Sequence, residues 1–248
     1  MKGVPNNLGV EEFIRTGFDL KSHLANFLGV TIKDVEKLLP TSSDDLAALH
    51  PGSLKAEDAN DFYEKNVGIG HLLELSAWHL SSSNYIADTI KLESMFSRGQ
   101  VLDFGGGIGT HALAAAGLEN VEHVWFVDLN PNNREFVMKR AHLLGIEKKI
   151  SVHRGIENTG EVLFDTLICL DVLEHLPDPS SQLKHFLKRL SPKANVLLNW
   201  YFFKGFRGEY PFHFDDPLMI KNFFQTLQGS FIEVFHPYLI TTRLYQPI

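Results

Sequence analysis

A glycine-rich segment between residues 105 and 109 comes two residues after an acidic position, Asp103. Because glycine has no side chain, such a loop lets a ligand approach the backbone closely. The segment Gly107–Ala112 also satisfies the dinucleotide pattern GxGxxA, in which a pyrophosphate binds at a helix N-terminus. A carboxylate at Asp103 would repel a pyrophosphate and attract the ammonium of an amino-acid moiety. The loop therefore indicates a cofactor site whose ligand carries positive charge near Asp103.

A second acidic residue, Asp128, ends the next apolar run, Glu122–Val127. A carboxylate at that point can accept two hydrogen bonds from vicinal ribose hydroxyls. NAD sites use the same arrangement. Asp128 therefore supports an adenosine-containing ligand without choosing between NAD and another adenosine derivative.

Two histidines are candidate bases, since imidazole titrates near neutral pH. His175 follows the apolar run Phe164–Leu170, and His213 lies in the aromatic segment Tyr210–Asp216. Each also has a structural interpretation: His175 packs or caps within its loop, and His213 belongs to a packed surface loop. Both interpretations remain open for both residues.

The same two regions offer nitrogen and oxygen ligands to a metal ion. Asp171 and His175 form one possible pair, and His213 forms another with Asp215 or Asp216. None of these spacings is diagnostic. We therefore expect no metal site.

The elements that must position these residues alternate along the second part of the chain. Capping signals start two of the helices, at Asn130-Pro131 and Asp178-Pro179. A further helix near 217–227 precedes two more expected strands, near 231–235 and 239–246. The earlier expected strands are 100–104, 122–127, 149–153, 164–170 and 195–200.

Strands that alternate with helices indicate βαβ units and a parallel sheet covered on both faces. Ligands bind such sheets at the carboxyl ends of the strands. Asp103, Asp128 and Asp171 all fall at strand ends. The candidate site therefore lies where this fold places ligands.

Residues 1–97 form an expected helical N-terminal domain, and residues 98–248 the cofactor domain. Thr31 and Asp34 have the spacing of a capping box. The Ser-, Asp-, Pro- and Gly-rich segment 41–57 predicts a loop. It is followed by expected helices at about 59–80 and 82–96. The first carries three candidates for a lid over the site, Tyr63, Trp78 and His79, although an amphipathic core face explains Trp78 equally well.

Three motifs occur in a fixed order: VLDFGGGIG at 101–109, WFVDLNP at 125–131 and FDTLICLDVLEHLPDP at 164–179. Together they resemble the motifs of class I S-adenosylmethionine-dependent methyltransferases, in the style of the ubiquinone and menaquinone methyltransferases. The resemblance covers residues 98–200 clearly. It implies an α/β, Rossmann-like fold with a seven-stranded, mostly parallel sheet whose last strand is antiparallel.

The resemblance also implies positions for the parts of S-adenosylmethionine. Asp128 should bind the ribose, and Leu129 should pack on the adenine. Leu170 and Asp171 should lie beside the methionine amino group or the substrate entrance. The positions that should flank the methionine part are Asp103, Gly105, Gly106, Gly107, Gly109 and Thr110.

The sequence departs from the family pattern after the third expected strand. Ile156 stands where an Asp that receives the adenine amino group is usual. Glu157 or Asn158 could substitute for it, or Ile156 could pack on the ring. The sequence leaves these alternatives open.

These features predict methyl transfer from S-adenosylmethionine to a small, partly apolar molecule, with oxygen, nitrogen or carbon as the methylated atom. The alternatives are an NAD-type oxidoreductase and a cofactor-binding protein of the same fold without turnover. Asp103 and the LDVLEHL segment argue against the oxidoreductase. The N-terminal helices could close over the site or form a homodimer interface.

Bulk properties limit the partners. The net charge of −7 disfavours nucleic-acid binding, which needs a cationic face. The sequence contains no run of ~18 apolar residues, so we expect no membrane span. The first residues lack the apolar stretch of a signal peptide. We therefore expect a cytoplasmic protein. The single cysteine, Cys169, lies in an apolar run and should pack in the core.

Overall fold

The computed structural model describes residues 8–49, 54–237 and 240–248. Three expectations fall partly outside these ranges. They concern the first seven residues of the N-terminal domain, residues 50–53 of the expected loop, and the start of the expected strand at 239.

The described residues form one sheet of seven strands in the order β3-β2-β1-β4-β5-β7-β6. Strands β1 to β5 pair in parallel, whereas β7 is antiparallel to both β5 and β6. This topology confirms the predicted fold class. The strands are β1 (Gly99–Phe104), β2 (Val121–Val127), β3 (Ile150–His153), β4 (Phe164–Cys169), β5 (Leu190–Leu198), β6 (Phe231–Phe235) and β7 (Arg243–Pro247).

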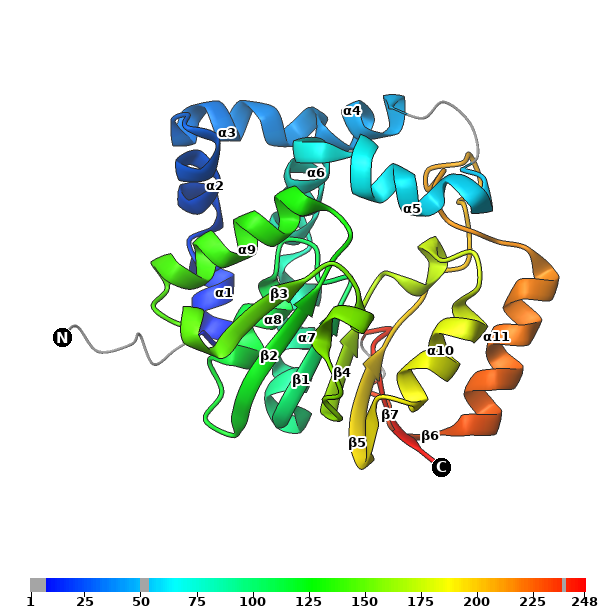
Figure 1. The fold of residues 1–248 in the computed structure, drawn as a ribbon. Coiled ribbons are helices and arrows are strands. Elements are labelled where there is room, and N and C mark those ends of the chain that lie inside the picture. The colour runs from blue at the N-terminus through cyan, green and yellow to red at the C-terminus, as the bar shows by residue number, and fades with distance from the viewer. Residues whose placement is uncertain (1–7, 50–53, 238–239) are drawn as a thin grey trace.

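Helices cover both faces of the sheet (Figure 1). Consecutive strand residues point to opposite faces, so Val101 and Leu102 of β1 enter two different clusters of buried side chains. The first cluster is shared with α7 (Ser83–Phe96), α8 (Thr110–Ala116) and α9 (Pro131–Leu143), and the second with α10 (Pro179–Leu187) and α11 (Pro217–Ser230).

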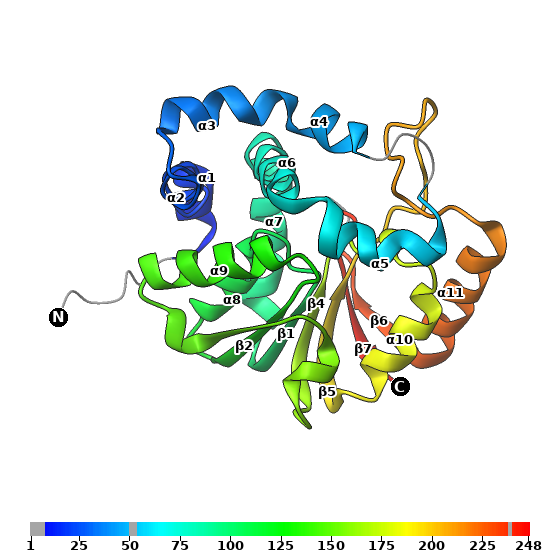
Figure 2. The ribbon, with the colours of Figure 1, turned by 45° about the horizontal axis from the view of Figure 1, so that its top comes forward.

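Most of the remaining N-terminal helices lie above the carboxyl ends of the parallel strands (Figure 2), whereas the first helix, α1 (Val10–Thr16), packs beside α7. Leu24 and Leu72 pack there with Ile108 of the glycine loop and with Phe136 of α9. The predicted capping box at Thr31 and Asp34 is confirmed. These helices are α1 (Val10–Thr16), α2 (Leu20–Leu28), α3 (Ile32–Leu38), α4 (Ser42–Ala48), α5 (Ala59–Asp61) and α6 (Gly68–Ser81).

The prediction of a loop over 41–57 is wrong in its first part, because α4 occupies Ser42–Ala48. Asp44 and Asp45 lie in the first turn of α4, where carboxylates interact favourably with the helix dipole. Leu46 is buried against Phe62 and its neighbours. A long-range apolar contact therefore stabilises a helix whose local composition is typical of a loop.

The expected helix over 59–80 is interrupted. A π-helical turn, Phe62–Asn66, separates α5 from α6. Such turns are often found at functional sites. Here the turn contains Tyr63, one of the predicted lid residues.

Arg140 of α9 connects the N-terminal helices to the glycine loop. Its guanidinium is fully buried and donates hydrogen bonds to the carbonyl oxygens of Ile108 (2.9 Å), Gly17 (3.0 Å) and Phe18 (3.3 Å). Burial lowers the pKa of Arg140 to about 9. One side chain thus fixes the start of the chain against the loop.

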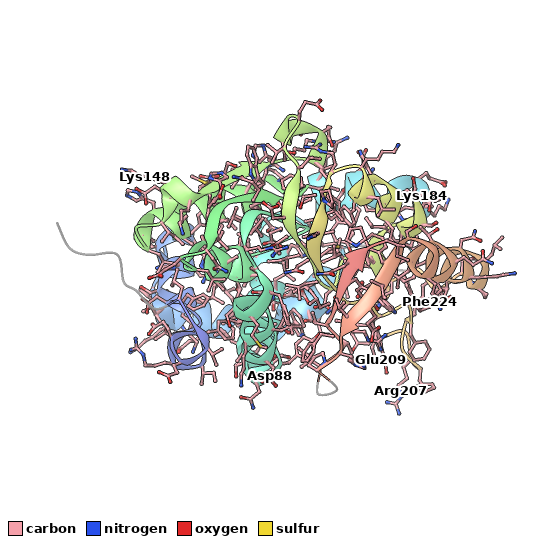
Figure 3. All side chains as sticks on the ribbon, turned by 90° about the horizontal axis from the view of Figure 1, so that it is seen from below. Asp88, Lys148, Lys184, Arg207, Glu209 and Phe224 are labelled. Carbon is pink, nitrogen blue, oxygen red and sulfur yellow. The ribbon has the colours of Figure 1, made fainter. Side chains whose placement is uncertain are left out.

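The amino ends of the parallel strands lie on the side of the sheet that carries none of the predicted site residues. Figure 3 shows this end of the strands, with Lys148 beside β3 and Lys184 on α10 at opposite sides of the molecule. A cavity of about 540 Å³ opens here, lined in part by Phe96, Asn195 and Phe235. The candidate chemistry lies at the other end of the strands.

Candidate functional site

The glycine loop joins β1 to α8 through left-handed backbone. Gly105, Gly107 and Gly109 have φ angles of 72°, 55° and 75°. Residues other than glycine rarely adopt such positive φ angles. A Cβ atom on Gly107 would lie 2.7 Å from Leu75 Cδ1 of α6. The loop therefore requires glycine both for its conformation and for the close approach of the N-terminal helices.

Asp103 lies beneath this loop, at the end of β1. Its side chain is 2% exposed, and its Oδ2 has no hydrogen-bond partner among the described residues. Burial raises the pKa of Asp103 to about 7, and Glu93 and Asp128 add to the rise, while His111 opposes it. A buried carboxyl oxygen without a partner is suited to receive a donor from a ligand.

A second buried acid, Glu93, lies near Asp103. Glu93 of α7 lies 2.5 Å from His111 of α8, measured from Oε1 to Nδ1. Burial acts to lower the pKa of His111, but the carboxylates of Glu93 and Asp103 outweigh it and raise this pKa. The neighbouring His79 has its pKa lowered well below the usual value by burial. The pair Glu93–His111 thus lies close enough to Asp103 to influence its pKa.

Asp128 follows β2 and is buried at 7% exposure. Its Oδ2 accepts a hydrogen bond from the Gly107 amide (2.9 Å), and its Oδ1 accepts from the Asn130 amide (2.8 Å) and Asn133 Nδ2 (3.1 Å). Burial raises the pKa of Asp128 to about 6, although these hydrogen bonds favour the carboxylate. The acid at the second strand is therefore fixed against the glycine loop, with the half-buried Leu129 beside it.

The segment after β3 divides its residues between the core and the surface. Ile156 is 3% exposed and packs in the sheet core, and Glu157 is exposed. Arg154 pairs with Glu64 of the π-helical turn through two hydrogen bonds of 2.6 and 2.7 Å. Asn158 accepts a hydrogen bond from the Gly155 amide (3.0 Å). The N-terminal helices thus contact this strand end as well.

Asp171 follows β4 and has a strained conformation. Its φ angle is 54°, which is uncommon outside glycine. Asn199, after β5, holds it: Asn199 Nδ2 donates to Asp171 Oδ1 (3.0 Å) and to the hydroxyl of Tyr85 (2.9 Å). Leu170 beside it is half-buried. Strain at a strand end that faces the glycine loop is typical of functional positions.

A cluster of aromatic and imidazole rings follows Asp171. The Tyr63 hydroxyl lies 2.8 Å from His175 Nδ1, and the rings of His175 and His213 are 4.7 Å apart. The Phe214 amide donates to the Glu174 carbonyl oxygen (2.7 Å). Both predicted candidate bases therefore meet in one place, together with a predicted lid residue.

Titration favours the uncharged forms in this cluster. Burial lowers the pKa of His175 to about 3, and the nearby His213 contributes. Burial also lowers the pKa of His213. Burial raises the pKa of Glu174 to about 8, with a contribution from Asp171. At neutral pH the two imidazoles are neutral in the structure as it stands.

The acids near His213 have other partners. Asp216 caps α11, since its Oδ1 accepts from the Met219 amide (2.7 Å). Asp215 lies 3.4 Å from Lys204 Nζ. Neither acid joins His213 in a ligand group; instead Glu174, His175 and His213 each present an atom within 4.8 Å of the others.

Several residues of this site were not singled out from the sequence. Glu93 could have been found, because it continues the buried stripe Ile86–Ile90 of α7 as a lone acid. Asn133 and Asn199 gave no signal, since their roles depend on partners that only the fold brings near. In the part of the chain that the structure describes, no helix is long and apolar enough to cross a membrane.

A family profile described as a methyltransferase domain matches residues 78–202, half of the chain. A ubiquinone biosynthesis O-methyltransferase of Xylella fastidiosa (strain M23) is 32% identical over 124 residues, which cover 47% of this chain and 46% of that protein. A ubiquinone biosynthesis O-methyltransferase of Aromatoleum aromaticum is 32% identical over 108 residues, which cover 40% of this chain and 43% of that protein. The chain thus matches less than half the length of these curated relatives.

One solved structure extends the likeness to most of the chain. The crystal structure of a provisionally assigned O-methyltransferase from Nostoc punctiforme superposes with a TM-score of 0.57. It covers 91% of this chain and 72% of that one, at 14% identity. At this identity the likeness concerns the fold alone, including its N-terminal helical part.

Proposed function

Because the chain belongs to the methyltransferase-domain family, whose methyl donor is S-adenosylmethionine, we propose that it transfers a methyl group from this donor to a small, partly apolar acceptor. One observation carries the proposal. Asp103, Asp128 and Asp171 lie at or just after the carboxyl ends of three adjacent strands, around a loop that requires glycine. This arrangement offers an acid to each polar part of the donor.

The chemistry of these groups fits S-adenosylmethionine. The unpartnered Oδ2 of Asp103 would accept a hydrogen bond from the donor's ammonium group. Asp128, whose carboxylate is oriented by the Gly107 amide, would accept hydrogen bonds from the ribose hydroxyls. The sulfonium cation gains from the same acidic surroundings. Such a site selects a cationic amino-acid ligand over the pyrophosphate of NAD.

The adenine would lie between Leu129 and the segment after β3. Ile156 is buried in the core beneath that segment, so we propose apolar packing there in place of the usual acid. Glu157 lies 3.9 Å from Arg154 and is directed to a surface ion pair. Asn158, which is bound to the Gly155 amide, helps to fix the shape of this wall.

The acceptor would enter beside His175 and His213. Tyr210 stacks on His213 with ring centroids 5.0 Å apart, and Tyr201 and Tyr63 border the same cluster. Aromatic side chains suit an apolar or aromatic molecule. The relatives named ubiquinone biosynthesis O-methyltransferases support oxygen as the methylated atom. The two neutral imidazoles would mark the point where the acceptor loses its proton.

The N-terminal helices would exclude water during transfer. Tyr63 contacts His175, and Leu75 packs over Gly107. Exclusion of water strengthens the electrostatic interactions within a site. We propose residues 1–97 as this lid and residues 98–248 as the donor-binding domain; association of two chains through the same helices stays a prediction.

Titration calorimetry tests the donor assignment. S-adenosylmethionine and S-adenosylhomocysteine should bind with micromolar affinity, and NADH should not. Asp128→Ala and Gly107→Val should abolish binding, whereas the matched controls Asp88→Ala and Gly229→Val, on exposed helix positions, should bind normally. Undiminished binding by both site variants would refute the assignment. Binding without donor consumption across a broad panel of acceptors would favour a protein without turnover.

A further inference from the structure

The cluster at the end of β4 contains one carboxylate and two imidazoles, a donor set found in metal centres. Glu174 and His175 belong to the turn after β4, and His213 comes from the loop before α11. One possible ligand atom from each lies within 4.8 Å of the other two. In sequence, His213 is far from the other two residues, which is why spacing gave no signal.

The glutamate is buried and incompletely satisfied. Glu174 is 1% exposed, and its Oε2 has no hydrogen-bond partner within the described ranges. A buried carboxyl oxygen is rarely left without a partner. A cation held between Glu174 and the two histidines would supply one.

The histidines are oriented as metal ligands usually are. His213 Nδ1 lies 3.0 Å from the Phe203 carbonyl oxygen, and His175 Nδ1 lies 3.3 Å from that of Phe212. Since a carbonyl oxygen only accepts, the first contact places the proton of His213 on Nδ1 and leaves the Nε2 lone pair for a metal. His175 Nδ1 also lies 2.8 Å from the Tyr63 hydroxyl, so the protein contacts of this ring are on its Nδ1 side and Nε2 is the nitrogen left for a metal.

The loop that carries His213 is anchored to the same turn. The Phe214 amide donates to the Glu174 carbonyl oxygen at 2.7 Å, so the backbones on either side of the cluster are joined. In a tetrahedral zinc site, nitrogen and oxygen ligands lie about 3.4 Å from one another. The possible ligand atoms here lie within 4.8 Å of one another, so side-chain movements of about 1 Å would enclose an ion.

We propose that Glu174, His175 and His213 bind a divalent first-row transition ion of the Zn²⁺ class. Two imidazoles and one carboxylate favour such an ion over Mg²⁺ or Ca²⁺, which prefer all-oxygen sites. Three protein ligands leave a coordination position open. The site faces the aromatic side chains proposed to border the acceptor.

The role of the ion rests on the proposed function. An acceptor hydroxyl bound at the open position would lose its proton to solvent before the N-terminal helices exclude water, because a bound cation lowers the pKa of a coordinated oxygen. The oxygen lone pair would then attack the methyl carbon of S-adenosylmethionine. The carbon–sulfur bond breaks, its electron pair stays on sulfur, and S-adenosylhomocysteine leaves.

The test is calorimetric titration of chelator-treated protein with ZnCl₂, followed by absorption spectroscopy with Co²⁺ as a substitute. Wild type should bind one equivalent of each ion and bind MgCl₂ far more weakly. Glu174→Gln and His213→Ala should each weaken Zn²⁺ binding by at least about tenfold. His185→Ala, an exposed histidine on α10, is the matched control and should bind as wild type does.

Circular dichroism of each metal-free variant establishes that it folds. Folded Glu174→Gln and His213→Ala proteins that bind Zn²⁺ as tightly as wild type would overturn the proposal, as would wild type that binds no Zn²⁺. Titration with S-adenosylhomocysteine separates the two proposals. His213→Ala should retain its affinity for that ligand, and a wild type that binds Zn²⁺ but not S-adenosylhomocysteine would refute the proposed function alone.

Discussion

Replacing Asp103 with asparagine should stabilise the ligand-free protein and weaken donor binding at the same time. Burial raises the pKa of Asp103 to about 7 from an ordinary 3.8. A group with a raised folded-state pKa binds protons more tightly in the native state. Its contribution to stability is therefore complete below pH 3.8 and is lost as the pH rises to about 7.

The magnitude follows from the free energy of a pKa difference, ~1.4 kcal/mol for each pKa unit. Between pH 5 and pH 7 this group should lower the wild-type free energy of unfolding by about 3 kcal/mol. Asparagine has the same shape as the protonated acid and does not ionise. Relative to wild type, Asp103→Asn should thus gain about 3 kcal/mol of stability between pH 5 and pH 8.

Donor binding should change in the opposite direction. The variant loses a hydrogen bond between a carboxylate and the ammonium of the ligand, which contributes about 1.5–3 kcal/mol. Affinity for S-adenosylhomocysteine at pH 8 should fall roughly 10- to 150-fold. Urea unfolding at pH 5 and pH 8 measures the first effect, and calorimetry measures the second. Equal pH dependence of stability in both proteins, or unchanged affinity, would refute the reasoning.

Three further outcomes follow from the same structure. In wild type, affinity for S-adenosylhomocysteine should weaken as the pH falls from 8 to 6, because Asp103 takes up a proton near pH 7; Asp103→Asn should show a flatter calorimetric profile over that range. Arg140→Met should lower the free energy of unfolding by about 2–4 kcal/mol, since three buried carbonyl oxygens lose their donor, and urea unfolding measures this. Tyr63→Phe should remove about 1 kcal/mol of local stability, so that amide hydrogen exchange in residues 62–66 speeds up about fivefold.

Each of these outcomes has a contrary result. A constant affinity between pH 8 and pH 6 would remove Asp103 from the ligand site. Unchanged stability of Arg140→Met would mean that its carbonyl partners find water instead. Unaltered exchange in Tyr63→Phe, with Tyr85→Phe as a comparison outside the π-helical turn, would show that the hydroxyl does not hold the turn closed.

The sheet and its ligand edge could be predicted because their signals are local. Each strand is a short apolar run, and the helix starts at Asn130 and Asp178 carry a capping side chain followed by proline. The acids at the strand ends then follow from topology, since parallel strands present their carboxyl ends together. Confirmation of the sheet order places Asp103, Asp128 and Asp171 on one edge.

The parts that could not be predicted depend on contacts between distant residues. Burial of Leu46 against Phe62 and its neighbours stabilises a helix in a segment that is polar in composition. The contact of Tyr63 with His175 joins residues 112 positions apart, and no spacing rule connects them. Likewise, sequence proximity suggested Asp215 and Asp216 as metal-binding partners of His213. In the fold, Asp216 caps α11 and Asp215 lies near Lys204.

A crystal structure with S-adenosylhomocysteine tests the central claim most directly. We predict that its ribose hydroxyls contact Asp128, its amino group contacts Asp103 and its sulfur faces the cluster of His175 and His213. Density for the ligand at any other place, such as the cavity beside Phe96 and Phe235, with the glycine loop empty, would contradict the account.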